Sequence, residues 1–293
     1  MSRTQTRSPA SRGILLMLAA VALFTAMDAL AKGLVADYPT LQVVWARYTG
    51  QTVIVALVLG RRLPALLRTR YPGLQAFRSA CQFGATALFF FSLGFIGLAE
   101  ATALVDINPV LITLGAALFL GEKLGPRRIF GVVAALVGAL IVIRPGLGVF
   151  TPAALLPLGC AVCYAGYAIA TRHVGRDESA WTSLVYAALL GTVVTSLAMP
   201  AIWEPVAARH LPAFLALGLL GAAAQFCLIR AFTLAEASAV APFGYVGLIF
   251  ATFWGIVLFD EYPDLWTIVG ALVIVAAGLY VWHRETRASR NTA

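Results

Sequence analysis

Apolar residues fill long stretches of this chain, and short polar segments interrupt them at fairly regular intervals. Ten stretches are long enough to cross a lipid bilayer, since a helix that does so needs about 20 predominantly apolar residues. They cover residues 13–34, 41–60, 75–97, 99–120, 127–144, 153–173, 179–200, 211–232, 236–258 and 265–283. The connections are short and hold Gly, Pro, Arg or acidic residues. The pattern therefore predicts an all-α membrane protein with ten transmembrane helices and no soluble domain.

The composition excludes a water-soluble fold. Of the 293 residues, 61% are hydrophobic and 12% are charged, whereas soluble domains average roughly 45–50% and about 25%. The net charge of +8 raises the possibility of a nucleic-acid partner. No basic helix or aromatic RNA-binding motif accompanies the charge, so we expect no such partner.

The positive residues instead concentrate on one side of the membrane. Seventeen of the 21 Lys and Arg residues lie in the tails or at the ends of spans expected on one side, and only Lys32, Arg144 and Arg209 lie at the other side. The positive-inside rule then places both termini in the cytoplasm. The expected location is a cytoplasmic (inner) membrane of the bacterial type, crossed ten times.

Metal and cofactor sites are not expected. The four cysteines lie inside apolar runs, and the three histidines are far apart at the ends of such runs. Cys160 and Cys163 have the spacing of half a zinc or redox site, but the sequence offers no second ligand pair, so buried apolar packing explains them better.

A phrase occurs twice in the chain, as "LAEATALV" at 98–105 and as "LAEASAVA" at 234–241. When the two copies are aligned onwards with three extra residues in the second, Glu122 falls on Glu261. Spans 1–5 therefore form one copy and spans 6–10 another. Each copy has an odd number of spans, so the second enters the membrane from the opposite face.

The expected architecture is two inverted five-helix repeats, at 12–147 and 151–284, with cytoplasmic tails at 1–11 and 285–293. Inverted repeats that enclose a midplane site are the signature of many secondary transporters, which rock between two accessible states. A membrane-embedded enzyme or a receptor-like protein would not need this symmetry. No catalytic constellation of His/Asp, Ser/Lys or metal ligands gathers at one depth, so we expect no enzyme.

Three motifs resemble those of the EamA-type drug/metabolite transporter superfamily. They are the glutamate that follows the fourth span of each copy, in "LGEKLGPRR" and in "FDEYPDLW", and "MDALAK" in the first span. The resemblance is closest to bacterial amino-acid exporters, including the aromatic branch, and it implies export of amino acids by alternating access. One departure concerns the prolines: the first copy has Pro109 in mid-span 4, where the second has Tyr245 and carries its proline at Pro242.

Polar residues inside the spans mark a cavity or pathway, because they are costly in lipid. Thr102, Asp106 and Pro109 form one stripe on span 4, and the repeat maps this stripe onto the face of span 9 that carries Pro242 and Tyr245. Similar stripes lie on spans 3, 6 and 8. The candidate cavity residues are Gln82, Thr86, Phe89, Thr102, Asp106, Asn108, Tyr164, Tyr167, Gln225, Ser238 and Tyr245.

Asp28 and Arg47 are equally far from the turn between spans 1 and 2, so an antiparallel hairpin would place them at one depth. We expect the two charges to pair, with Lys32 competing for Asp28 from the next turn of the helix. These three residues would form either a gate or a permanent tie between helices.

The expected lining lacks Lys or Arg near the midplane, which argues against phosphorylated substrates. A small amphoteric or aromatic solute fits better, and amino-acid export is the leading interpretation. Import or export of another amphoteric metabolite or drug stays open. The lipid bilayer and a small-molecule substrate are the expected partners. Spans 5 and 10 carry small residues that indicate helix packing, either within one chain or at a homodimer seam, so a monomer and a homodimer both remain possible.

Overall fold

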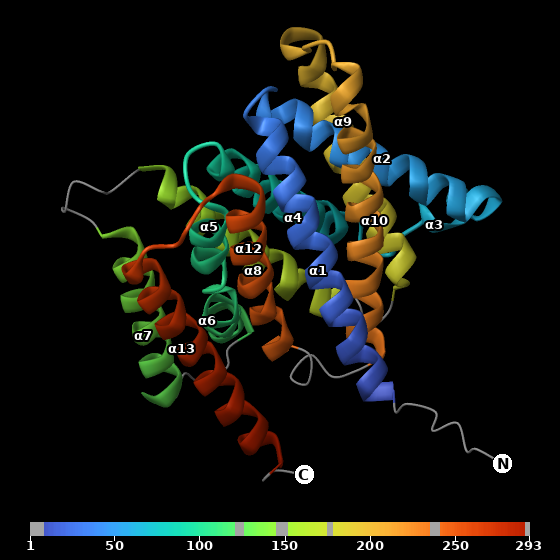
Figure 1. Ribbon diagram of the computed structural model, residues 1–293. Helices are drawn as coiled ribbons and strands as arrows, with labels where there is room; N and C mark the ends of the chain where they lie inside the picture. The colour runs from blue at the N-terminus through green and yellow to red at the C-terminus, as the bar shows by residue number, and fades with distance from the viewer. Residues whose placement is uncertain (1–8, 121–125, 145–151, 175–177, 235–240, 291–293) are drawn as a thin grey trace, which may run out of the picture.

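The computed structural model describes residues 9–120, 126–144, 152–174, 178–234 and 241–290. Every regular element in these ranges is helical (Figure 1). The α-helices are α1 (Pro9–Val35), α2 (Thr40–Leu59), α3 (Leu63–Leu66), α4 (Pro72–Leu93), α5 (Leu98–Val105), α6 (Asn108–Leu120), α7 (Pro126–Ile143), α8 (Leu155–Val174), α9 (Ala180–Ile202), α10 (Leu211–Leu234), α12 (Val246–Phe259) and α13 (Leu265–Arg290). Short 3-10 helices cover Gly60–Arg62, Pro152–Ala154, Ala208–His210 and Ala241–Tyr245.

The predicted fold class is confirmed: the chain is an all-α membrane protein built from two inverted five-helix repeats. Within the described residues, eight of the predicted spans are single helices, and spans 4 and 9 are composite. The first and last helices run further into the predicted tails than the hydrophobic pattern indicated, with α1 beginning at Pro9 and α13 ending at Arg290. A helix that leaves the lipid no longer needs apolar residues, so hydropathy alone cannot find its end.

Span 4 is broken into α5 and α6 at Asp106 and Ile107. Pro109 lies directly after the break, in the first turn of α6. Proline cannot donate a backbone hydrogen bond, and its ring clashes with the carbonyl four residues earlier, so an unbroken helix through this point is disfavoured. In span 9, Pro242 lies in the 3-10 helix that precedes α12. The prolines do not correspond in the repeat, but Pro242 falls on Asp106 in the alignment of the two copies, so the two irregular segments lie at related positions.

The contacts between helices follow the repeat. Span 1 packs against span 8 (α1 with α10), and its counterpart contact joins span 3 to span 6 (α4 with α8). Contacts that relate a span to its own counterpart include α7 with α13 and α2 with α9. Figure 1 shows α7 and α13 side by side at one flank of the bundle. This pairing is what a pseudo-two-fold axis within the membrane plane would produce.

Glycines allow two of these contacts to close. A Cβ on Gly138 of α7 would lie 2.9 Å from the carbonyl oxygen of Gly270 on α13, and a Cβ on Gly50 of α2 would lie 2.7 Å from Cα of Gly218 on α10. Both distances are too short for a side chain. The small-residue faces of spans 5 and 10 therefore meet within one chain.

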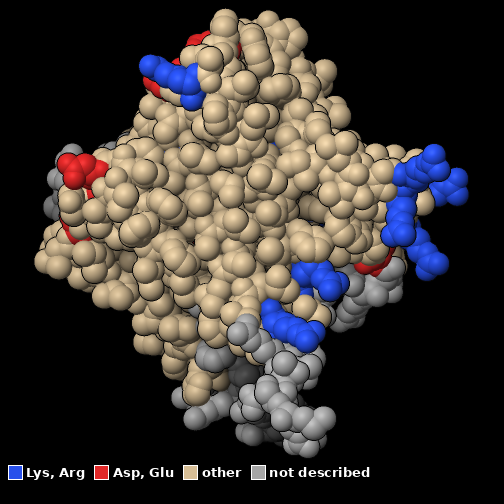
Figure 2. Space-filling model, turned by 45° about the vertical axis from the view of Figure 1, so that its right-hand side comes forward, with Lys and Arg blue, Asp and Glu red and all other residues tan. Residues whose placement is uncertain are grey.

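The outside of the bundle is apolar. Leu57, Leu197 and Leu272 are among many large hydrophobic side chains that remain exposed. Figure 2 shows a broad uncharged surface, with charged side chains near its margins. Such a surface suits the hydrocarbon of a bilayer and would aggregate in water.

Candidate functional site

A chain of buried hydrogen bonds joins three predicted cavity residues from three helices. Gln82 on α4 donates from Nε2 to Oε1 of Gln225 on α10 over 3.0 Å, and Gln225 donates from its own Nε2 to the hydroxyl of Tyr167 on α8 over 2.9 Å. The exposed fractions are 8%, 1% and 6%. Because polar atoms buried this far from water need partners, the three side chains fix one another in the centre of the bundle.

Arg78 extends this network, and the sequence did not identify it as a site residue. Its guanidinium donates to Tyr167 Oη (3.0 Å), to Thr171 Oγ1 (2.7 Å) and to the carbonyl of Ser183 (2.9 Å), and the side chain is fully buried. Its Cζ also lies 4.6 Å from the centre of the Tyr167 ring. We counted Arg78 among the charges at a membrane surface, and this must be corrected. The signal was its spacing, since Arg78 lies one turn before Gln82 on the same face of α4.

Thr86 is the next residue on this face of α4, one turn after Gln82, and it accepts a hydrogen bond from Arg47. Nη1 of Arg47 donates to Thr86 Oγ1 over 2.5 Å, and its Nε lies 3.3 Å from the sulfur of Met27. Tyr48 also donates to Thr86, over 3.0 Å. Arg47 is buried, and its Cζ lies 4.8 Å from the Tyr48 ring. Two buried guanidiniums, that of Arg78 on α4 and that of Arg47 on α2, therefore lie along one polar face of α4, so the expectation that the lining lacks basic side chains was wrong.

The predicted bond between Asp28 and Arg47 is absent. The structure describes both residues, and it has no ion pair between them within 4.0 Å. The assumption of a packed hairpin was wrong, because α1 packs mainly along α10 and α2 along α10 and α9. Gly221 of α10 approaches both sides: a Cβ there would lie 3.3 Å from the Met27 sulfur and 3.5 Å from Arg47 Cγ. Arg47 therefore reaches α1 at Met27, next to Asp28, without forming an ion pair with Asp28.

A second polar group lies at the helix breaks. Asp106 and Asn108 flank the break of span 4, and Tyr245 ends the 3-10 helix of span 9. Asp106 Oδ2, Asn108 Oδ1 and Tyr245 Oη are buried and have no hydrogen-bond partner among the described residues. Asp106 and Tyr245 interact electrostatically, so the two breaks face each other. Open acceptors of this kind favour a polar ligand or water here.

The other candidates have simpler surroundings. The rings of Tyr164 and Tyr167 are 5.6 Å apart between centroids, which gives an aromatic surface on α8. Phe89 is buried in the apolar core, and Thr102 donates to the carbonyl of Leu98 in its own helix. Ser238 lies outside the described residues. A single pocket that includes all the candidates stays a prediction.

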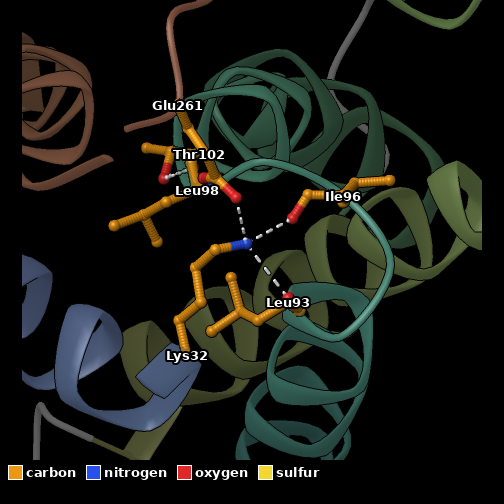
Figure 3. Close-up of polar contacts among 6 residues, drawn as sticks. All are labelled: Lys32, Leu93, Ile96, Leu98, Thr102 and Glu261. Carbon is orange, nitrogen blue, oxygen red and sulfur yellow. Dashed lines mark hydrogen bonds and ion pairs between the residues drawn. The ribbon is translucent and has the colours of Figure 1, made fainter. Parts of the chain in front are cut away.

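Lys32 lies in the last turn of α1 and contacts segments from other spans (Figure 3). Its ammonium lies 2.9 Å from Oε1 of Glu261 and donates to the carbonyls of Leu93 (3.1 Å) and Ile96 (2.8 Å). The other carboxylate oxygen, Oε2, accepts the backbone N–H of Leu98 over 3.1 Å. Lys32 therefore bonds Glu261 and not Asp28, which corrects our expectation. We call these residues the Lys32 lock, and they join spans 1, 3, 4 and 9.

Local backbone geometry aims Glu261 into the lock. The chain leaves α12 through Asp260, whose φ of 55° is left-handed, and the N–H of Glu261 bonds the carbonyl of Gly255 over 3.0 Å. The left-handed Asp260, whose N–H also bonds the carbonyl of Ile256 over 3.2 Å, ends the helix as an αL C-cap does, and Asp tolerates this conformation better than most residues. The sequence marked Glu261 as a repeated glutamate but gave no reason to pair it with Lys32.

A second ion pair lies near the same end. Arg144 Nη2 is 2.6 Å from Asp264 Oδ2, and Asp264 also accepts the N–H of Thr267, at the start of α13, over 2.8 Å. Burial by itself raises the pKa of Asp264, but the bonds from Thr267 and the nearby Arg144 guanidinium outweigh it and hold that pKa below the usual value. This carboxylate is 45% exposed, so the pair contributes little to stability.

Comparison with known proteins decides the family. The model of the EamA-like transporter family matches residues 11–144 and again 151–282. The chain belongs to this family. EamA proteins are transporters, and the chain is therefore a multi-pass membrane transporter and not an enzyme. A solved crystal structure agrees with the fold, with a TM-score of 0.66 at 21% identity over 95% of this chain and 99% of that one.

Other EamA transporters carry different solutes. The pseudopaline exporter CntI of Pseudomonas aeruginosa is 31% identical, over 90% of this chain and 94% of its own length. A riboflavin transporter of Rhizobium johnstonii is 32% identical, over 78% of this chain and 76% of its own. An S-adenosylmethionine uptake transporter of Rickettsia bellii is 27% identical, over 76% of each. These relatives show that the family transports small metabolites. They differ in the solute that they carry, so the solute and direction of this transporter have to be inferred from its own site.

Proposed function

We propose that this EamA transporter exports a small amphoteric metabolite with an amino-carboxylate head, and that amino acids, including aromatic ones, are its substrates. The observation that carries the proposal is the Gln82–Gln225–Tyr167 chain. It crosses the repeat boundary and is continued by two buried guanidiniums. Arginine is suited to carboxylates, which it binds through two parallel hydrogen bonds. The Tyr164–Tyr167 surface suits an aromatic or apolar side chain.

Alternating access would follow from the two composite spans. Spans 4 and 9 meet near their irregular segments, where Asp106 and Tyr245 interact electrostatically, and a break of this kind would let one half of a span tilt relative to the other. We assign the Lys32 lock to the outer gate, because the basic asymmetry puts the end of span 1 outside and both termini in the cytoplasm of a cell with an inner membrane. The solute would enter from the cytoplasm while the lock is closed and leave when it opens.

The two gates would differ chemically. In the repeat, Lys32 corresponds roughly to Thr171, and Thr171 accepts a hydrogen bond from Arg78. The outer gate would therefore depend on an ion pair and the inner one on hydrogen bonds to an arginine. Glu122, the repeat partner of Glu261, lies outside the described residues.

Uptake into proteoliposomes tests the substrate class. Labelled phenylalanine, riboflavin and S-adenosylmethionine would be compared in vesicles with the purified protein and in empty vesicles. We expect the protein to accelerate phenylalanine entry roughly tenfold or more and to leave the other two near the empty-vesicle rate. Carriage of riboflavin or S-adenosylmethionine in place of phenylalanine would overturn the amino-acid proposal and leave the family assignment intact.

A further inference from the structure

Asp28 and Arg47 have side chains of opposite charge and interact electrostatically, yet no nitrogen of Arg47 lies within 4.0 Å of a carboxylate oxygen of Asp28. The hydrogen bonds of Arg47 go to Thr86 and Met27, while Asp28 makes none to the described residues. A guanidinium has five N–H donors and an ionised carboxylate accepts about four bonds. Most of the N–H donors of Arg47 and all the acceptor sites of Asp28 are therefore unused by the described residues.

Other contacts hold Arg47 in place. Its Nε lies 3.6 Å from where a Cβ on Gly221 would be, and its Cζ lies against the rings of Tyr48 and Phe90, 4.8 and 6.0 Å from their centres. Thr86 is itself fixed, because its hydroxyl donates to the carbonyl of Gln82 over 3.1 Å. The guanidinium is thus positioned without help from Asp28, as a preorganised binding group is.

Free opposite charges in a low-dielectric site normally collapse onto each other, since separation forfeits the attraction that offsets their desolvation. Two such groups held out of hydrogen-bonding contact, one with unused donors and the other with unused acceptors, suit a ligand that carries both charges. Asp28 also interacts electrostatically with Cys160. Tyr164 lies one helical turn after Cys160 on α8, so an aromatic surface lies near Asp28.

We infer that Asp28 and Arg47 bind the two ends of an α-amino-carboxylate head, with the solute's ammonium on Asp28 and its carboxylate on Arg47. This inference rests on the proposed function and assigns residues to it. It replaces the helix tie expected from the sequence: the two side chains are held apart for the solute, which completes the pair.

The test is competition in proteoliposomes that carry labelled phenylalanine. Phenylalaninamide keeps the ammonium and lacks the carboxylate, and N-acetylphenylalanine keeps the carboxylate and lacks the ammonium. In the wild type we expect each analogue to compete roughly tenfold or more weakly than phenylalanine, because hydrogen bonds to charged groups are worth about 1.5–3 kcal/mol. Arg47→Gln should abolish the preference over the amide and keep the preference over the acetyl compound, and Asp28→Asn should do the reverse.

Arg144→Gln is the matched control, since it removes a guanidinium other than that of Arg47 and should leave both preferences unchanged. Ratios of competition are insensitive to the amount of folded protein. If a variant does not fold, Arg47→Lys or Asp28→Glu takes its place; each keeps the charge but changes the geometry, and should weaken the corresponding preference in part. If the wild type transports phenylalanine but both variants lose affinity equally for all three compounds, the assignment of Asp28 and Arg47 is wrong and the amino-acid function stands. If the wild type neither transports nor binds phenylalanine, the assignment of Asp28 and Arg47 and the amino-acid function are both wrong.

Discussion

Lys32→Met will open the outer end of the bundle and reduce transport roughly five- to thirtyfold. The substitution keeps an unbranched chain of similar length but removes the donor of three bonds, to Glu261, Leu93 and Ile96. Breaking a buried ion pair costs on the order of 3–5 kcal/mol. Glu261 is 33% exposed, so solvent screening reduces this to about 1–2 kcal/mol, which is roughly a five- to thirtyfold shift toward the open state.

The shift toward the open state can be measured by the rate at which an introduced cysteine is labelled. Thr102→Cys, in a background without the four native cysteines, should react several-fold faster with a membrane-impermeant reagent from outside once Lys32 is changed. Arg144→Met is the control because it breaks the exposed Arg144–Asp264 pair at the same end, and we expect little change. Equal effects of both substitutions would mean that the Lys32 lock is an ordinary surface contact and no gate.

Gln225→Leu will destabilise the protein and abolish most transport. It removes an acceptor from Gln82 and a donor from Tyr167, which remain buried with unmet hydrogen-bonding groups. Each such group costs about 1–3 kcal/mol. The measurement is Tm in detergent together with uptake of labelled solute.

Gln51 on α2 offers an unusually close control. It is also 1% exposed, but its side-chain oxygen and nitrogen both lack partners among the described residues. Gln51→Leu therefore breaks no hydrogen bond and replaces an unpaired buried amide with an apolar group, so we expect an unchanged or higher Tm. A loss of stability equal to that of Gln225→Leu would show that the hydrogen-bond chain is not what makes Gln225 important.

The fold was predictable because bilayer thickness and backbone hydrogen bonding leave few solutions. Apolar stretches of span length must become helices in lipid, and the repeated "LAEA" phrase indicated the symmetry. The stripes on spans 3, 6 and 8 placed Gln82, Tyr167 and Gln225 on facing surfaces, and the structure joins them directly.

The charge pairs were not predictable in the same way. Residue counting gives a depth along a helix but not its neighbours, so it could not show that α1 packs mainly along α10 and that Arg47 meets Met27 and Thr86 in place of Asp28. Lys32 and Glu261 are 229 positions apart in sequence, and only the packing of spans 1, 3 and 9 brings them together. Arg78 was missed because a charge near the end of a span usually faces the membrane surface, whereas here Tyr167, Thr171 and Ser183 receive it inside.

Counterflow tests alternating access most directly. Proteoliposomes with the wild-type protein would be loaded with unlabelled phenylalanine at high concentration and diluted into a trace of labelled phenylalanine. A carrier whose site faces one side at a time returns with label after each release, so the label should accumulate transiently inside above its external concentration. Entry that only approaches equilibrium, at the same rate in loaded and unloaded vesicles, would contradict the account.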